Sequence, residues 1–292
     1  MIYLIIVSFL WAPSFGLVGH YLKGVDANFV AAARVVLSLV VFLPLMRVKG
    51  ISFPRLLALA GIGALQFGAM YVLYIHAFAW IAAPEVALFT IFTPLLVTLF
   101  DDLFERRVSW MFLAMATLAV IGTGIIQWTT LGTRGVLVGF GLMQLSNGCF
   151  ALGQVLYRRV SPAAKGRDHE VMAILYLGAA IVAGAAAATS LDIDKLRLLS
   201  STQWLVLLYL GAIASGVGFF LFNAGARMAD IGALAICNNL KVPLAILASV
   251  WLFHDHVNWP RLLIGGSLIG AALAINECAI WRKRGAGHFG RQ

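Results

Sequence analysis

The stretch AICNNLKVPLAI, residues 235–246, places Asn238, Asn239 and Lys241 inside a segment that is otherwise apolar. A charge near the centre of a bilayer costs about 2.5–3.5 kcal/mol on insertion scales, so it is expected to face a cavity or a partner rather than lipid. Pro243 lacks an N–H group, which leaves the carbonyl of Asn239 without its helical donor. The stretch therefore predicts a transmembrane helix that turns polar groups toward a protein interior.

The whole chain has the composition of an integral membrane protein. Its 292 residues are 62% hydrophobic and 11% charged, whereas a soluble domain is about 25% charged. Repeated apolar runs of about 20 residues are long enough to cross a bilayer as helices, and they leave little sequence for a soluble domain. We expect an all-α membrane protein. A membrane enzyme or receptor is disfavoured, because the sequence shows neither a catalytic dyad nor an extramembrane domain.

The apolar runs predict ten transmembrane helices. Polar or Pro/Gly-marked breaks divide them into spans at 2–22, 28–46, 55–80, 84–101, 109–128, 135–157, 170–190, 203–226, 231–252 and 259–281. With a cytoplasmic N-terminus, fourteen of the Lys and Arg residues fall on the inner side, five on the outer side and two within spans. This bias predicts that both termini are cytoplasmic. It also interprets the net charge of +9 as a topology signal rather than a nucleic-acid-binding surface.

The two halves of the chain resemble each other. An offset of 149 aligns Tyr71 with Phe220, Ala77 with Ala226, Pro94 with Pro243, Val108 with Val257 and Trp110 with Trp259, and an offset of 135 aligns Phe15 with Phe150, Leu17 with Leu152 and Lys23 with Arg158. Because each half has five spans, the second must enter the membrane in the opposite orientation. Such inverted repeats are typical of secondary transporters. Chance similarity between apolar helices is the alternative.

These features predict one transporter domain over residues 1–292. It would comprise a first five-helix repeat in 1–130, a second in 133–281 and a basic cytoplasmic tail in 282–292. In such folds the substrate site lies near the midplane, where the two halves meet.

Polar and aromatic side chains inside the predicted spans mark a central binding cavity. Lys241 and Asn238 share one helix face, and a carboxylate ligand would find its counter-ion at Lys241. Trp11 lies too deep for an interfacial belt and suits a flat bicyclic ligand. The candidate substrate-binding residues are Lys241, Asn147, Asn239, Tyr74, Asn238, Ser146, Trp11, Tyr71, Thr90 and Gln144. Internal ion pairs and helix–helix hydrogen bonds are the alternative roles for these groups.

The remaining polar groups predict no further site. Arg34 lies about two turns into its span, and anchoring through outer-side polar groups or snorkelling is favoured over substrate binding. The three cysteines, Cys149, Cys237 and Cys278, lie in apolar runs without metal-ligand spacing. No P-loop lysine accompanies any glycine-rich run, so we expect no cofactor, metal or nucleotide site.

Several motifs resemble a known family. The stretches ARVVLSL, residues 33–39, and LFERRVSW, residues 103–110, resemble the EamA-type carriers of the drug/metabolite transporter superfamily, and the similarity covers essentially the whole chain. Residues 88–95, 143–153, 214–220 and 236–243 resemble the biotin uptake carriers of enteric bacteria. In LFHDHVNW, residues 252–259, His254 stands where Glu105 stands in the first half, which departs from the family pattern.

The resemblance implies a function and a location. It implies a monomeric, multi-pass protein of the bacterial inner membrane that imports biotin, or a similar small carboxylate, as a secondary carrier. An exporter of amino acids or amphipathic metabolites on the same fold is the alternative, because fold alone does not fix the substrate. Its partners would be a small-molecule substrate and the lipid bilayer.

Overall fold

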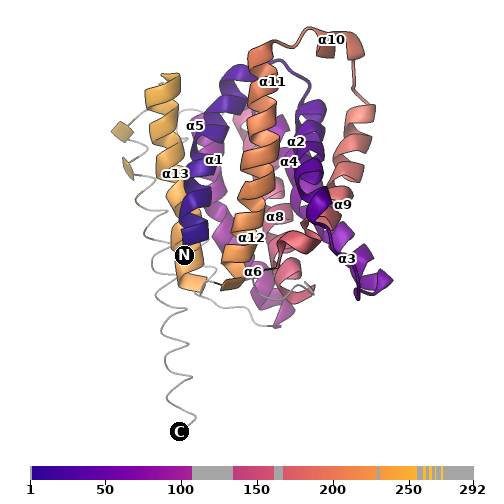
Figure 1. The fold of residues 1–292 in the computed structure, drawn as a ribbon. Coiled ribbons are helices and arrows are strands. Elements are labelled where there is room, and N and C mark those ends of the chain that lie inside the picture. Colours follow the sequence, from indigo (N-terminus) through magenta and orange to yellow (C-terminus); the bar gives the residue numbers. More distant parts are fainter. Residues whose placement is uncertain are drawn as a thin grey trace.

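The computed structural model describes residues 2–106, 134–160, 167–228 and 231–254, with a few more between 259 and 271. All elements in these ranges are helical (Figure 1). Seven of the described helices are long and apolar enough to cross a membrane: Ile2–Tyr21, Ala27–Leu45, Phe53–Ala77, Ala83–Phe104, Gly135–Val160, His169–Ala188 and Ser201–Met228. The expectation of an all-α membrane protein is confirmed. The predicted span 109–128, most of 259–281 and the tail 282–292 lie outside the described residues.

Several spans are built from more than one helical element. The first half contains α1 (Ile2–Tyr21), α2 (Ala27–Phe42), η1 (Leu43–Leu45), α3 (Phe53–Gly63), η2 (Ala64–Ala69), α4 (Met70–Ala77), α5 (Ala83–Phe89), η3 (Thr90–Phe92) and α6 (Thr93–Phe104). The second half contains α8 (Arg134–Val160), α9 (His169–Ala188), α10 (Ile193–Arg197), α11 (Ser201–Leu208), η4 (Tyr209–Val217), α12 (Gly218–Met228) and α13 (Ile231–Phe253). The apolar pattern gave no sign of the breaks inside the spans.

Two of these interruptions are π-helical segments, η2 and η4. They occupy overlapping positions when the halves are aligned with the offset of 149. A π segment disturbs the regular backbone ladder and often marks a functional site. In η4, side chains from other helices reach the backbone: Trp11 Nε1 donates to Ala214 O at 2.7 Å, and Ser38 Oγ donates to Gly211 O at 2.8 Å. The π segment of the second half is therefore tied to α1 and α2 of the first.

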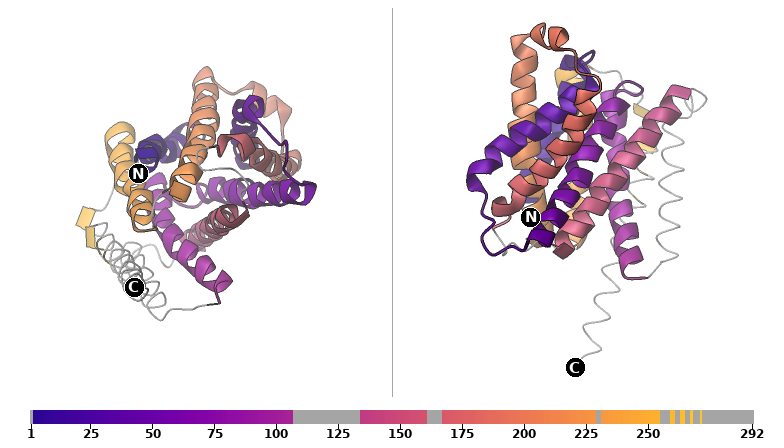
Figure 2. Two further views of the ribbon diagram at one scale, coloured as in Figure 1. Left: turned by 60° about the horizontal axis from the view of Figure 1, so that its bottom comes forward. Right: turned by 90° about the vertical axis from the view of Figure 1, so that its right-hand side faces the viewer.

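The helices pack in pairs that correspond between the two halves. The element α2 packs against η4, and α9, its counterpart in the repeat expected from the sequence, packs against α3 and η2. In the same way, α1 packs against α13 and α12, and α8, its expected counterpart, packs against α6 and α4. The helices α2 and α9 also pack against each other. Figures 1 and 2 show the resulting bundle, in which helices from both halves alternate around the centre.

Glycine lets α3 and α9 approach to backbone contact. A Cβ atom on Gly63 would lie 1.9 Å from the carbonyl oxygen of Leu175, and one on Gly178 would lie 1.8 Å from the carbonyl oxygen of Ala60. No side chain fits at these distances. Small residues of this kind are typical of helix interfaces in membranes, where close packing replaces the hydrophobic drive that water supplies.

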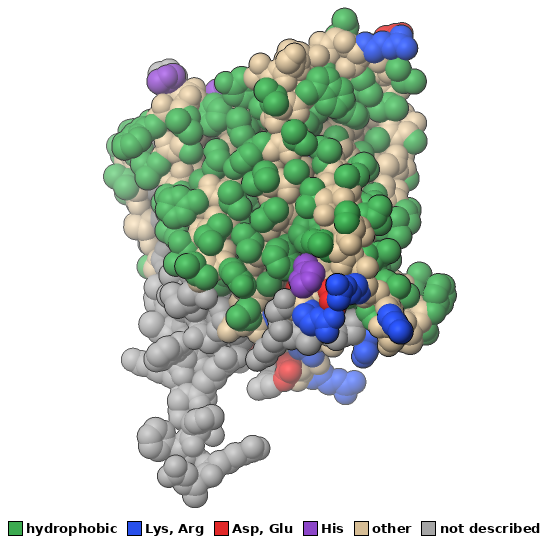
Figure 3. Space-filling view, in the orientation of Figure 1, with side chains coloured by type: hydrophobic (Ala, Val, Ile, Leu, Met, Phe, Trp, Pro, Cys, Tyr) green, Lys and Arg blue, Asp and Glu red, His purple; other side chains and the backbone are tan. Residues whose placement is uncertain are grey.

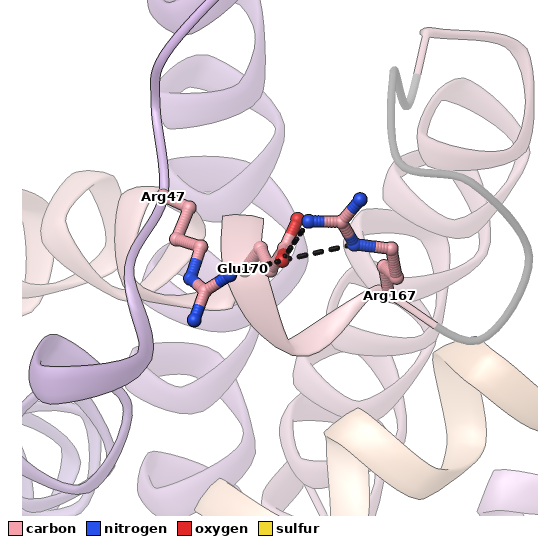
Figure 4. A network of polar contacts seen from close by, with 3 residues as sticks. All are labelled: Arg47, Arg167 and Glu170. Atoms are coloured by element: carbon pink, nitrogen blue, oxygen red, sulfur yellow. Dashed lines mark hydrogen bonds and ion pairs between the residues drawn. The ribbon is translucent and has the colours of Figure 1, made fainter.

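The surface is divided between apolar and charged regions. Figure 3 shows hydrophobic side chains over most of the face in view, with charged side chains gathered toward its two ends. In the network of Figure 4, Arg167 donates to Glu170 Oε1 from Nε at 3.0 Å and from Nη2 at 2.6 Å, and Arg47 Nη1 lies 3.8 Å from the same oxygen. This network joins the connection between α2 and α3 to the start of α9.

Candidate substrate-binding site

A cavity lies between helices of both halves. Its polar lining comprises Ser14, Arg34, Tyr71, Tyr74, Thr90, Thr93, Ser146, Asn147 and Lys241, and its apolar lining comprises Trp11, Phe15, Met70, Phe150 and Phe219. These residues come from α1, α2, the spans α3–α4 and α5–α6, α8, α12 and α13. The cavity thus combines aromatic walls with two basic side chains in the interior of an apolar bundle, which is the usual make-up of a small-molecule site.

The structure brings most of the predicted site residues together. Seven of the ten line this cavity: Lys241, Asn147, Tyr74, Ser146, Trp11, Tyr71 and Thr90. Gln144 lies on α8 but is not part of the lining, and its Nε2 atom is buried without a hydrogen-bond partner among the described residues. The side chains of Asn238 and Asn239 lie outside the described part of the structure.

Pro94 sets the position of Asn147 through a break in the fourth span. Because Pro94 has no N–H to donate to the carbonyl four residues earlier, that carbonyl, Thr90 O, accepts instead from Thr93 N in the 3₁₀ turn η3. Phe89 O then accepts from Asn147 Nδ2 at 2.8 Å, and Thr93 Oγ1 donates to Asn147 Oδ1 at 3.3 Å. Both ends of the Asn147 carboxamide are thereby fixed between α8 and the fourth span.

Arg34 is buried in the cavity wall, with 3% of its surface exposed. Its Nε donates to Ser215 Oγ at 3.1 Å and its Nη2 donates to Tyr71 Oη at 2.8 Å. The two hydroxyls are themselves 2.7 Å apart, and the guanidinium carbon lies 4.2 Å from the centre of the Tyr71 ring. Snorkelling is excluded by this burial. The anchoring partners are neutral hydroxyls of α4 and η4.

Lys241 is the second buried cation, at 5% exposure. Its Nζ lies 5.0 Å from the centre of the Trp11 ring, within the range of a cation–π contact. The Trp11 ring in turn packs against Phe219 at 5.1 Å and Phe150 at 6.5 Å between ring centroids. An ammonium group therefore lies beside a continuous aromatic wall in the interior of the bundle.

Sequence reasoning missed several lining residues. Phe15, Phe150, Phe219, Ser14, Met70, Thr93 and Arg34 were not among the candidates. The repeat held a signal for two of them, because Phe15 aligns with Phe150 at the offset of 135, and both rings face the same cavity. The others are ordinary in sequence, and only the packing of distant helices places them in the lining.

A bundle of apolar helices around a partly polar cavity is typical of membrane carriers. The sequence of this chain agrees with that class. It belongs to the EamA-like transporter family, whose sequence model matches residues 1–128 and again residues 133–276. The chain is a multi-pass protein of the bacterial inner membrane.

Similar proteins carry specific names. The chain is 41% identical over 280 residues to the biotin transporter of Salmonella typhimurium, covering 95% of this chain and 93% of that protein. It is 41% identical over 281 residues to a probable biotin transporter of Pseudomonas aeruginosa, covering 95% and 97%. It is 39% identical over 279 residues to the biotin transporter of Escherichia coli K12, covering 95% and 93%.

A solved crystal structure shares the fold. It matches with a TM-score of 0.66 over 94% of this chain and 95% of the other, at 18% identity. At this level of identity the match concerns the arrangement of the helices alone.

Proposed function

We propose that this protein imports biotin, or a similar small carboxylate, across the bacterial inner membrane by alternating access. The observation that carries the proposal is a cavity in which two buried cations, Arg34 and Lys241, stand beside aromatic rings. Two positive charges beside the aromatic rings make this cavity electrostatically more favourable for an anionic ligand than for a neutral or cationic one. The names of the relatives agree with a carboxylate that carries a bicyclic head.

The lining suits the two ends of such a ligand. Trp11, Phe150 and Phe219 give rigid apolar area for a ring system. The hydroxyls of Tyr71 and Tyr74 supply hydrogen bonds nearby. A charge-assisted hydrogen bond to the carboxylate would then select the acid over neutral analogues.

We further propose ten helices as a 5+5 inverted repeat, with both termini in the cytoplasm. Three observations support this: the helix pairs correspond between the halves, η2 and η4 fall at overlapping aligned positions, and the family model matches two successive stretches. The repeats would be 1–130 and 133–281, followed by the tail 282–292. Alternating access would come from rocking one half against the other around the cavity. Because helices from both halves of one chain line the cavity, we propose that the carrier works as a monomer.

Uptake into proteoliposomes tests the proposal. We expect labelled biotin to accumulate in vesicles that contain the protein, and excess unlabelled biotin to suppress the signal. Vesicles without protein are the control for leakage, and labelled amino acids are the control for substrate class. Uptake of amino acids without uptake of biotin would refute the proposal. Efflux of preloaded biotin without influx would refute the direction.

A further inference from the structure

Arg34 is a fixed buried cation whose charge is not compensated by an acidic group in the described ranges. Its two hydrogen bonds go to the neutral hydroxyls of Ser215 and Tyr71. No Asp or Glu of the described ranges lies within ion-pair distance of it. A buried cation held only by neutral groups is costly, and proteins normally supply a counter-ion.

The third guanidinium nitrogen is the unsatisfied one. Arg34 Nη1 is buried and has no hydrogen-bond partner in the part of the chain that the structure describes. Nη2 carries two hydrogens and donates one of them to Tyr71 Oη. The Nη1–Nη2 edge therefore still has N–H groups that can donate hydrogen bonds. Because Arg34 lines the cavity, an acceptor bound there can reach this edge. The guanidinium edge matches the spacing of the two oxygens of a carboxylate.

We infer that Arg34, rather than Lys241, binds the carboxylate of the substrate, and that Ser215 acts as its positioning residue. The inference rests on the proposed function and assigns the roles within its site. Arg34 has a planar guanidinium group held in place by hydrogen bonds to Ser215 and Tyr71. Lys241 has a single point charge beside the face of Trp11. One guanidinium group can bind both oxygens of one carboxylate. Lys241 then donates to an uncharged acceptor, such as a carbonyl oxygen in the ring system of the ligand.

The acid and its ester separate the two cations. Binding of biotin and of biotin methyl ester is measured on purified wild type, Arg34→Gln, Arg34→Lys and Lys241→Met. For Arg34→Gln we expect biotin affinity to fall by about 10- to 100-fold, the range for a lost charge-assisted hydrogen bond, with little change for the ester. Arg34→Lys keeps the positive charge but lacks the paired guanidinium N–H groups. Its biotin affinity should lie between those of wild type and Arg34→Gln. Lys241→Met should weaken acid and ester alike.

A second variant covers the case in which Arg34→Gln does not fold. Ser215→Ala keeps Arg34 but removes the hydroxyl that accepts from its Nε. The ratio of the affinity for biotin to the affinity for its methyl ester should therefore decrease, while the affinity for the ester stays as in wild type. Lys195→Gln is the control, because Lys195 is 79% exposed and lies outside the cavity. It should change the affinity for neither biotin nor its methyl ester. For the Arg34 and Ser215 variants, ester binding at the wild-type level reports that the site is intact.

The outcomes are distinct. Wild-type protein that binds neither biotin nor its ester would overturn the proposed function. Wild-type protein that prefers the acid, with this preference kept in Arg34→Gln or Ser215→Ala and lost in Lys241→Met, would overturn the assignment to Arg34 and leave the proposed function standing.

Discussion

Trp11 and Ala214 are joined by a hydrogen bond of 2.7 Å between the indole Nε1 and the backbone carbonyl, across 203 residues of sequence. The bond is buried, and its acceptor belongs to the π segment η4. The same indole ring lines the cavity and faces Lys241. One side chain therefore connects the first helix of one half, the π segment of the other half and the candidate site.

Trp11→Phe tests the contribution of this bond to stability. The substitution keeps an aromatic wall but removes this buried hydrogen bond, which contributes about 0.5–1.5 kcal/mol to stability. We expect a lower free energy of unfolding in detergent. Trp251→Phe is the control, because Trp251 is 76% exposed, and its expected effect is within about 0.5 kcal/mol. Equal stability of the two variants would contradict the prediction.

Gly63→Ala and Gly178→Ala test the contact between α3 and α9. The added Cβ would meet a backbone carbonyl, which cannot rotate away as a side chain can. We expect the free energy of unfolding of each variant to fall by about 3 kcal/mol or more, at the upper end for overpacking. A lower unfolding temperature and a lower yield of folded protein would show this loss. Gly61→Ala on α3 and Gly184→Ala on α9 are matched controls, since nothing lies within 4 Å of their added Cβ atoms. Controls as unstable as the test variants would argue against the contact.

Asp168→Asn and Asp101→Asn compare a buried ion pair with an exposed one. Asp168 is 1% exposed, accepts from Tyr157 Oη at 2.7 Å and pairs with Arg227. Asp168→Asn removes one charge of this pair at a buried position, at a cost of about 3 kcal/mol. Asp101 pairs with Arg159 at the surface, where such a bond contributes about 0–1 kcal/mol. In thermal unfolding, Asp168→Asn should lose more stability than Asp101→Asn. A larger loss for Asp101→Asn would show that burial does not determine the contribution of these ion pairs.

Lys241→Met should weaken binding of both biotin and its methyl ester by about 1–3 kcal/mol, the range for one hydrogen bond from a charged donor. The substitution keeps the approximate length of the side chain and its packing against Trp11 while it removes the charge. Isothermal titration with both ligands measures the effect. A loss confined to the acid would assign the carboxylate to Lys241, as the sequence by itself suggested.

Labelling of introduced cysteines tests the topology. A cysteine in the C-terminal tail should react only with membrane-permeant reagents, and one beside Lys195 should react with impermeant reagents in intact cells. The reason is the excess of Lys and Arg in the predicted inner loops. With a cytoplasmic N-terminus, an externally accessible tail would contradict both the even number of spans and the inverted repeat.

The sequence by itself determined the class of protein and much of the site. Runs of apolar residues admit one structure in lipid, the helix that satisfies its own backbone, so the described spans follow from composition and length. A polar group inside such a run is too costly to face lipid, and this reasoning predicted that Lys241 and Asn147 share one cavity, whose lining includes both residues. The corresponding helix pairs are likewise consistent with the aligned prolines and aromatics.

Only the tertiary structure decided how these groups are partnered. The π segments, the turn before Pro94 and the hydroxyls around Arg34 depend on helices far apart in sequence. A single helix cannot reveal whether its arginine will meet lipid, headgroups or a hydroxyl 181 residues away. Burial and unfilled hydrogen bonds are properties of packed neighbours, and for that reason Arg34 became the preferred candidate for the carboxylate only once its contacts with the second half were known.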